Sequence, residues 1–334
     1  MNRSASVTIT SRSQCWAYKF PFRITGHDWT ESEVVYVELE RDGLFGRGEC
    51  AGVYYKGDSP AHCLSEIERV SNEIARGADR KELLELLPPG GARNAIDCAL
   101  WDLEAKIQGR PVWQLAGLPA PHPVLTTYTI GADAAETMAE RARAFSDARA
   151  LKLKLTGTPS DAGCVRAVRQ ARPDVWLAVD ANQGFTRAFF AEILPVLQEA
   201  RVELIEQPFP LDRDGDMDGL QSPIPIAADE SAQTAHDLPN LVNRFNMVNI
   251  KLDKCGGLTA ALAMASRARE LGLGVMVGNM CGTSLAMAPA FLIGQLCDVA
   301  DLDGPLLLRD DRSPSAQYVE GSIWCGEDVW GNGG

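Results

Sequence analysis

Apolar and charged positions follow a regular pattern through the middle of the chain. Five short apolar runs recur at intervals of 22–26 residues, and a charged residue lies at the end of each run. The runs cover residues 151–155, 175–179, 202–205, 224–228 and 247–250, and the charged residues are Lys154, Asp180, Glu206, Asp229 and Lys251. One strand followed by one helix needs about this many residues, so the pattern predicts strands that alternate with helices.

Three further apolar runs extend this pattern in both directions. Residues 124–130 precede the five runs, and residues 274–278 and 297–302 follow them. Helical segments such as 134–148 and 259–271 fill the gaps between strands. Eight strands in alternation with helices predict a parallel α/β barrel over residues 121–304.

The first 120 residues follow a different pattern. Residues 34–39 alternate as a half-buried strand does, and a second strand ends near Glu49. Helical segments follow over about 59–76, 81–87 and 92–107. This order predicts an α+β domain over residues 1–120, and we expect residues 305–334, which lose the barrel rhythm, to complete that domain.

Composition restricts the partners and the cellular compartment. The net charge of −13 argues against nucleic acid as a partner. None of the nine cysteines forms a Cys-x-x-Cys pair, which favours free thiols in a reducing cytoplasm. No apolar run approaches the ~18 residues of a membrane span, and the first ten residues do not resemble a signal peptide. We therefore expect a soluble cytoplasmic protein without a membrane partner.

Three carboxylates follow three consecutive predicted strands. The carboxyl ends of parallel barrel strands converge at one mouth, so Asp180, Glu206 and Asp229 are expected to lie close together. Oxygen ligands of this kind suit Mg²⁺, and no histidine or cysteine at an equivalent position favours zinc. One such acid alone would be better explained as a helix N-cap, but three in series favour a metal site.

Lysines lie on both sides of these acids in the predicted barrel. Lys152 and Lys154 share one face of their strand, and Lys251 lies four strands further on, roughly opposite in an eight-stranded ring. Solvated surface lysines are the alternative explanation. A metal, a second lysine and partial desolvation would each lower a lysine pKa towards the ~7–8 that base catalysis needs. Such a site would stabilise an enediolate while lysines on both faces move the α-proton.

The strand ends carry short motifs that are specific as a set. They are Leu-Lys-Leu-Lys154, Val-Asp180-Ala-Asn, Ile-Glu206-Gln-Pro, Ala-Asp229-Glu-Ser and Asn-Ile-Lys251-Leu-Asp-Lys-Cys-Gly-Gly. Together they resemble the enolase superfamily, muconate-lactonizing subgroup, and the resemblance extends over nearly the whole chain. It implies an α+β capping domain on a modified (β/α)₇β barrel of the TIM type. It also implies that the three acids bind Mg²⁺, that Lys154 and Lys251 form the acid/base pair, and that Lys152 tunes Lys154.

A further motif, Asp301-Leu-Asp303-Gly-Pro, follows the last predicted strand. It is similar to the Asp-x-Asp motif of dipeptide epimerases such as L-Ala-D/L-Glu epimerases, where the two acids bind the α-ammonium group of the substrate. Without the resemblance, both residues would be explained equally well as loop acids. The implied reaction is a 1,1-proton transfer at the α-carbon of the C-terminal residue of a dipeptide, which is then the small-molecule partner.

The chain departs from these epimerases in the segment expected to close over the substrate. Asp28 and Trp29 stand where Ala-Glu epimerases carry an arginine that meets the substrate's glutamate. An indole cannot neutralise a carboxylate, so we predict a preference for hydrophobic or cationic side chains. Arg23 either replaces the missing arginine or is structural.

Two other segments depart from the usual family sequence. Tyr55 and Lys56 lie in a second covering loop, where they either contribute to specificity or form a solvated tip. Asn279 replaces a residue that is often cysteine and is expected to alter the pocket wall.

Other functions remain open at this stage. An N-acylamino acid racemase or a cycloisomerase would use the same barrel, lysines and Mg²⁺. A phosphate-binding isomerase would use Gly256 and Gly257 at a helix N-terminus, although tight-turn glycines are the simpler explanation. A non-catalytic, metal-stabilised barrel is the third alternative, and a homo-oligomer stays possible for each of them.

Overall fold

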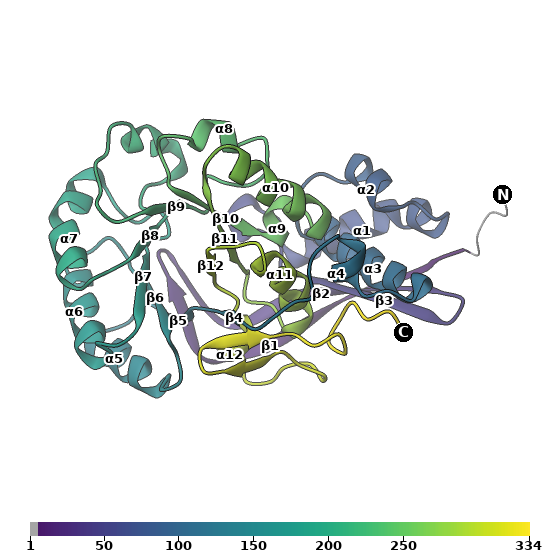
Figure 1. The fold of residues 1–334 in the computed structure, drawn as a ribbon, viewed down its shortest axis with the longest axis horizontal. Helices are drawn as coiled ribbons and strands as arrows, with labels where there is room; N and C mark the ends of the chain where they lie inside the picture. The colour runs from purple at the N-terminus through teal and green to yellow at the C-terminus, as the bar shows by residue number, and fades with distance from the viewer. Residues whose placement is uncertain (1–5) are drawn as a thin grey trace.

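The computed structural model describes residues 6–334. Its N-terminal part is an antiparallel sheet covered by helices (Figure 1). The strands are β1 (Thr8–Ile24), β2 (His27–Arg41) and β3 (Leu44–Cys50), and the helices are α1 (Pro60–Ala75), α2 (Arg80–Leu86) and α3 (Gly91–Gln108). Helix α3 packs against β3, and the core between them is apolar and fully enclosed. This unit is the capping domain that the sequence predicts.

Eight parallel strands within residues 6–334 form the second part, the barrel. They are β5 (Tyr128–Ile130), β6 (Ala150–Lys154), β7 (Trp176–Asp180), β8 (Leu204–Glu206), β9 (Ile226–Ala228), β10 (Met247–Lys251), β11 (Gly274–Gly278) and β12 (Val299–Ala300). They are hydrogen-bonded in this order, as the sequence pattern predicts. The helices between them are α5 (Ala135–Ala144), α6 (Asp161–Ala171), α7 (Arg187–Glu199), α8 (Leu238–Leu241), α9 (Leu252–Cys255), α10 (Leu258–Glu270) and α11 (Ser284–Gly294).

The first predicted barrel strand, residues 124–130, is divided in the structure. Its first two residues form β4 (Val124–Leu125), which pairs with β14 (Ser322–Trp324) in a separate sheet, and only its last three form β5. Between them, Thr126 bridges to Ala300 of β12 and its hydroxyl accepts a hydrogen bond from Leu302 N. The barrel therefore closes through a bend in the chain, which periodicity alone does not reveal.

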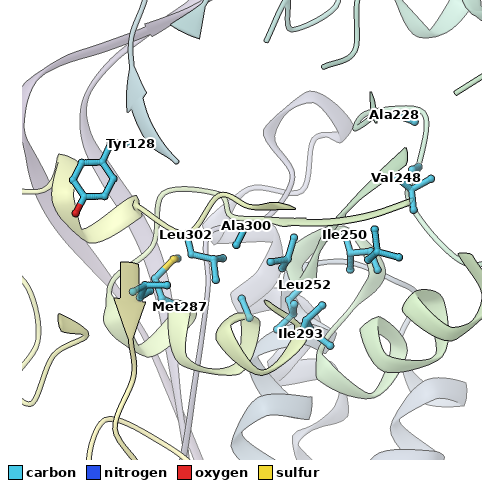
Figure 2. Close-up of a cluster of buried hydrophobic side chains, with 14 of the residues drawn as sticks. Tyr128, Ala228, Val248, Ile250, Leu252, Met287, Ile293, Ala300 and Leu302 are labelled. Atoms are coloured by element: carbon cyan, nitrogen blue, oxygen red, sulfur yellow. The ribbon is translucent and has the colours of Figure 1, made fainter. Parts of the chain in front are cut away.

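Alternation along each strand separates an apolar outward face from an inward face, whose polar residues lie towards the carboxyl ends of the strands. Leu151 and Leu153 of β6 lie in the large core between strands and helices. Figure 2 shows the corresponding layer near β10, where Ile250 lies with Ile293 of α11 and Ala300 of β12. Because the apolar side chains of β6 fill this layer, Lys152 and Lys154 face the barrel interior.

The β1–β2 hairpin is long enough to reach the barrel mouth (Figure 1). At its tip the Thr25 hydroxyl bonds to Leu155 O and Ala181 O, just beyond β6 and β7, and Arg23 O accepts a hydrogen bond from Ala132 N. Sequence reasoning did not predict a strand over most of β1. The structure thus replaces an expected loop over the substrate with the end of a two-stranded ribbon, whose register shifts between Ala17 and Phe22.

The chain after β12 runs back across both parts of the molecule (Figure 1). After the short helix α12 (Gly304–Leu307), Arg312 donates two hydrogen bonds to Glu49 of β3, and Glu49 also accepts bonds from Thr283 at the start of α11. Strand β13 (Gln317–Val319) then pairs with β14, and Trp330 donates a hydrogen bond to Arg47 O. Three distant segments therefore meet at one buried carboxylate.

No helix within residues 6–334 combines the length and the apolar character that crossing a membrane would require.

The pair Arg312–Glu49 gives a stability prediction. Glu49 is fully buried, so replacing Arg312 with methionine leaves a charge without its cation and should lower the free energy of unfolding by about 3 kcal/mol. Arg166→Met is the matched control, because the Arg166–Glu199 pair is exposed on both sides and should contribute less than about 1 kcal/mol. Urea denaturation of both variants measures the difference, and equal losses would contradict the prediction.

Candidate active site

Three carboxylates converge at the mouth of the barrel. Asp180 ends β7, Glu206 ends β8 and Asp229 directly follows β9, and all three side chains are buried. One oxygen from each lies within 4.8 Å of the others, in the only such cluster of potential ligands found among residues 6–334. Parallel strand ends thus bring together acids that lie far apart in the sequence, as expected.

Three lysines surround these carboxylates and face the same pocket. Lys154 Nζ lies 2.6 Å from Asp180 Oδ2, and Lys251 Nζ lies 2.6 Å from Asp229 Oδ2. These two lysines come from β6 and β10, with the three acid-bearing strands between them. Lys152 lies behind them, where it contacts Glu206 at 3.2 Å and also pairs with Asp301.

The charges of this cluster control one another's ionisation. Burial, followed by the negative charge of Asp180, raises the pKa of Glu206 to about 7. Burial opposes ionisation of Asp229 too, but the ion pairs with Lys251 and Lys254 hold its pKa well below its usual range. The group of acids is therefore stable only while cations face it.

With no cation on the acids, the carboxylates decide the pKa of two of these lysines. Burial does lower the pKa of Lys152 and of Lys251, but the facing carboxylates outweigh burial and hold both values well above the ordinary one. The cause is direct ion pairing, because Lys152 contacts Glu206 and Asp301, and Lys251 contacts Asp229.

The acids of the Asp-x-Asp motif lie at the end of β12, on the Lys152 side. Asp301 accepts a hydrogen bond from Thr127 Oγ1 at 2.6 Å, and Asp303 accepts one from Thr129 N at 2.5 Å. Burial and the neighbouring charge of Asp301 raise the pKa of Asp303 to about 7. Within residues 6–334 no ion pair involves Asp303, so this side of the pocket has an unmatched acid.

A pocket of about 370 Å³ lies above these groups. The hairpin contributes an aromatic and aliphatic wall, which consists of Tyr18, Phe22, Ile24 and Trp29. Tyr54 and Tyr55 continue this wall from the capping domain, and the Tyr54 ring packs edge-on against Trp29 with centroids 5.1 Å apart. Asn279 lines the opposite side and donates a hydrogen bond to Asp301 O.

Three of the residues singled out in the covering segments, Arg23, Asp28 and Lys56, do not line this pocket. Trp29 pairs with Phe22 across the hairpin, whereas the neighbouring pair, Asp28 and Arg23, lies on the other face. Arg23 bonds to Asp28 at 2.8 Å and to Asp133 at 3.3 Å, so its charge is already matched. Lys56 is exposed and lines a different cavity, on the far side of the Tyr54–Lys56 turn.

Sequence reasoning missed several residues that the structure brings to the site. Lys254 is buried and bonds to both the carboxylate and the backbone carbonyl of Asp229. Glu230 lines the pocket, and its Oε2 is buried without a hydrogen-bond partner among residues 6–334. Glu230 directly follows Asp229, and Lys254 lies three residues after Lys251. A second charged residue beside each predicted site residue was therefore the signal that the sequence offered. Tyr18 and Phe22 gave no comparable signal, because their role depends on hairpin pairing.

The two glycines considered for phosphate binding have another function. Gly256 has φ +83° and Gly257 has φ +109°, and an added Cβ would lie 2.3 Å from Arg93 and 2.5 Å from Asp97, respectively. Side chains of α3 thus occupy the space beside both residues. The glycines serve a tight turn that brings α10 close to the capping domain, where Asp97 accepts hydrogen bonds from Thr259.

Two parts of the chain match known protein families. Residues 132–325 match the family described as enolase C-terminal domain-like, and residues 6–117 match the mandelate racemase / muconate lactonizing enzyme N-terminal domain. The chain belongs to the enolase superfamily. Within this superfamily, the L-Ala-D/L-Glu epimerase of Escherichia coli K12 is 39% identical over 318 residues, which cover 95% of this chain and 99% of that protein.

Other members of the enolase superfamily are similarly close. An N-acetyl-D-glutamate racemase from a Pseudoalteromonas species is 40% identical over 250 residues, 75% of this chain and 79% of that protein. An Agrobacterium tumefaciens structure, described as homologous to dipeptide epimerases with bound sodium and L-Ala-L-Glu, has a TM-score of 0.94 and 39% identity over 97% of this chain and all of that one. The structure of a Methylococcus capsulatus dipeptide epimerase with Mg and L-Arg-D-Lys has a TM-score of 0.87 and 30% sequence identity. The match covers 96% of this chain and 97% of that one.

The buried Asp97 gives a pH prediction. Burial raises the pKa of Asp97 from 3.8 to about 6, although bonds from Thr259 oppose this. The folded state therefore holds its proton more tightly than the unfolded state, and the free energy of unfolding should fall as pH rises from about 4 to 6. Asp97→Asn lacks this proton and should lose that part of the slope. Urea denaturation of both proteins between pH 4 and 8 measures it, and parallel curves would refute the assignment.

Proposed function

We propose that the chain is a Mg²⁺-dependent dipeptide epimerase that moves the α-proton of the C-terminal residue by 1,1-proton transfer. One observation carries the proposal: Lys154 and Lys251 approach the acid cluster from strands on its two sides and face one pocket. An α-carbon held between two such amines has a base on one face and an acid on the other. That arrangement permits inversion of configuration, which a single amine does not.

The acid cluster fits a hard cation. Asp180, Glu206 and Asp229 offer carboxylate oxygens at close range, without a nitrogen or sulfur ligand, and this donor set suits Mg²⁺. The raised pKa of Glu206 supports the fit, because its cause is burial beside another acid, which a cation would relieve. When bound, Mg²⁺ would supply positive charge to the substrate's carboxylate as the α-proton leaves and an enediolate develops.

The lysines would exchange partners during the reaction. Lys154 and Lys251 would give up their contacts with Asp180 and Asp229 and turn towards the α-carbon from opposite sides. One amine takes the α-proton, and the ammonium group on the other face returns a proton. Lys152, which stays paired with Asp301 and Glu206, would keep a positive charge near the substrate's carboxylate.

The Asp-x-Asp acids favour a dipeptide over an N-acylated amino acid. A dipeptide carries a free ammonium group, and Asp303 provides a buried carboxylate that no cation of the described chain matches. An N-acylated substrate has no such charge and would leave the carboxylate unpaired in a dry site. The N-acetyl-D-glutamate racemase relative makes this the alternative to test, and the acid pair is the observation against it.

The pocket wall supports a preference for apolar or cationic side chains rather than glutamate. The hairpin side of the pocket is aromatic and aliphatic, and its acidic members are Glu31 and Glu33. Arg23, the one nearby arginine considered for this role, is paired with Asp28 and Asp133. Two relatives at 39% identity argue the other way: the Escherichia coli protein is named an L-Ala-D/L-Glu epimerase, and the Agrobacterium tumefaciens structure contains L-Ala-L-Glu. Side-chain preference therefore needs its own test.

The cysteines support a reducing compartment such as the cytoplasm. All nine are free thiols, and most are buried. Proteins exported to oxidising compartments usually pair their cysteines.

The proton-transfer proposal predicts complementary behaviour of two variants. Lys154→Met and Lys251→Met should each reduce epimerisation by about 10³-fold or more, since each removes one acid/base group. Each variant should still exchange with D₂O the α-hydrogen of the one diastereomer whose α-hydrogen faces the remaining lysine. The diastereomer that exchanges should therefore differ between the two variants.

Proton NMR of a mixed L,L-dipeptide library, and of the corresponding L,D-dipeptides, in D₂O with Mg²⁺ gives both readouts. Lys81→Met, an exposed lysine of α2, is the matched control and should behave as the wild type does. Wild-type protein that leaves every α-hydrogen signal intact would end the proposal, and so would N-acylated amino acids reacting better than dipeptides.

The side-chain preference is tested by restoring a cation to the wall. Trp29→Arg should raise kcat/KM for L-Ala-L-Glu by roughly tenfold and lower it for dipeptides with an apolar C-terminal residue. Trp29→Leu keeps the wall apolar and should not favour glutamate. Competition kinetics on a dipeptide library measures these ratios, and a clear wild-type preference for L-Ala-L-Glu would show that the wall has been misread.

A further inference from the structure

Asp253 is a buried carboxylate for which the proposed proton transfer has no use. It lies in α9, two residues after Lys251, and does not line the substrate pocket. Its Oδ1 atom accepts hydrogen bonds from two consecutive backbone amides, Ala51 N and Gly52 N, both at 2.9 Å. These amides belong to the capping domain, some 200 residues earlier in the chain. The carboxylate therefore connects the barrel to the segment that follows β3.

The segment held by Asp253 forms one wall of the pocket. It leads from Ala51 through the short turn Tyr54–Lys56, and both tyrosines face the substrate space. The chain is tightly turned here, because Gly52 has φ +76° and a Cβ at this position would lie 2.1 Å from Asp58 O. At the other end, Asp58 accepts a hydrogen bond from Gly91 N of α3. The wall is thus fixed at both ends and at Tyr55, where Gln233 of the barrel donates a hydrogen bond to the hydroxyl at 2.8 Å. Asp253 holds the start of the wall on the barrel.

We infer that Asp253 is a positioning residue that holds the Tyr54–Tyr55 wall at a fixed distance from Lys251. The inference rests on the proposed function, which makes Lys251 an acid/base group. Helix α9 begins at Leu252, directly after β10, so the backbone between Asp253 and Lys251 is short and regular. Substrate wall and proton-transfer group are therefore parts of one rigid unit, although they come from different domains.

The hydrogen-bond geometry makes a matched pair of variants available. Asp253→Ala removes the acceptor and leaves two buried amides unpaired. Asp253→Asn keeps an oxygen that can accept both bonds, because both amides use the same atom of the native carboxylate. Only the alanine variant should release the wall, so the pair separates the acceptor's role from that of the negative charge.

The expected effect is on substrate binding more than on turnover. Asp253→Ala should raise KM for the preferred dipeptide by roughly tenfold and change kcat by less than about threefold, while Asp253→Asn stays within about threefold of the wild type in both. Amide hydrogen exchange across residues 51–58 should be faster in the alanine variant and unchanged in the asparagine variant. Asp253→Leu, which keeps the branching at Cγ but has no acceptor, replaces the alanine variant if the latter does not fold.

The two readouts separate this inference from the function on which it rests. Hydrogen exchange needs no catalytic activity, so wild-type protein that epimerises no dipeptide would defeat the proposed function and leave the exchange result to be judged alone. Unchanged exchange in both Asp253→Ala and Asp253→Leu would overturn the inference. Faster exchange with equal losses in kcat and stability, and no change in KM, would also overturn it, because Asp253 would then serve stability alone.

Discussion

The structure depends on one electrostatic constraint at the barrel mouth: carboxylates buried side by side need cations between them. Asp180 and Asp229 each lie 2.6 Å from a lysine, and Glu206 lies 3.2 Å from a third. Few folds can enclose so many charges, because each must leave water and find a partner in a fixed position. Parallel strands with polar ends and apolar flanks meet this requirement, since the outer layer stabilises the barrel independently of its mouth.

The other walls of the site come from segments remote in the sequence, and each is fastened to the barrel by a few directed bonds. Thr25 attaches the hairpin to the ends of β6 and β7, Asp253 attaches the segment after β3, and Glu49 joins the capping domain to α11 and the C-terminal segment. The bonds to Asp253 and Glu49 use acids that are buried and take no part in the proposed chemistry. Buried polar groups here define where one domain sits on the other.

The sequence was informative where one local rule decides the outcome. Strand–helix periodicity located the barrel, and strand ends located Asp180, Glu206 and Asp229, because parallel strands converge without further information. The sequence was not informative where pairing between distant segments decides the structure. The division of residues 124–130 depends on β14, nearly 200 residues away, and the entry of Trp29 rather than Asp28 into the pocket depends on its register with β1.

The hairpin register has a consequence for how this pocket can diversify. Adjacent side chains of a strand point to opposite faces, so Trp29 lines the pocket while Asp28 turns towards Arg23 on the outside. Inserting or deleting a single residue near the tip would exchange the two faces and present a carboxylate in place of an indole. Inserting or deleting one codon would thus reverse the polarity of the wall, with no substitution at any position that now lines the pocket.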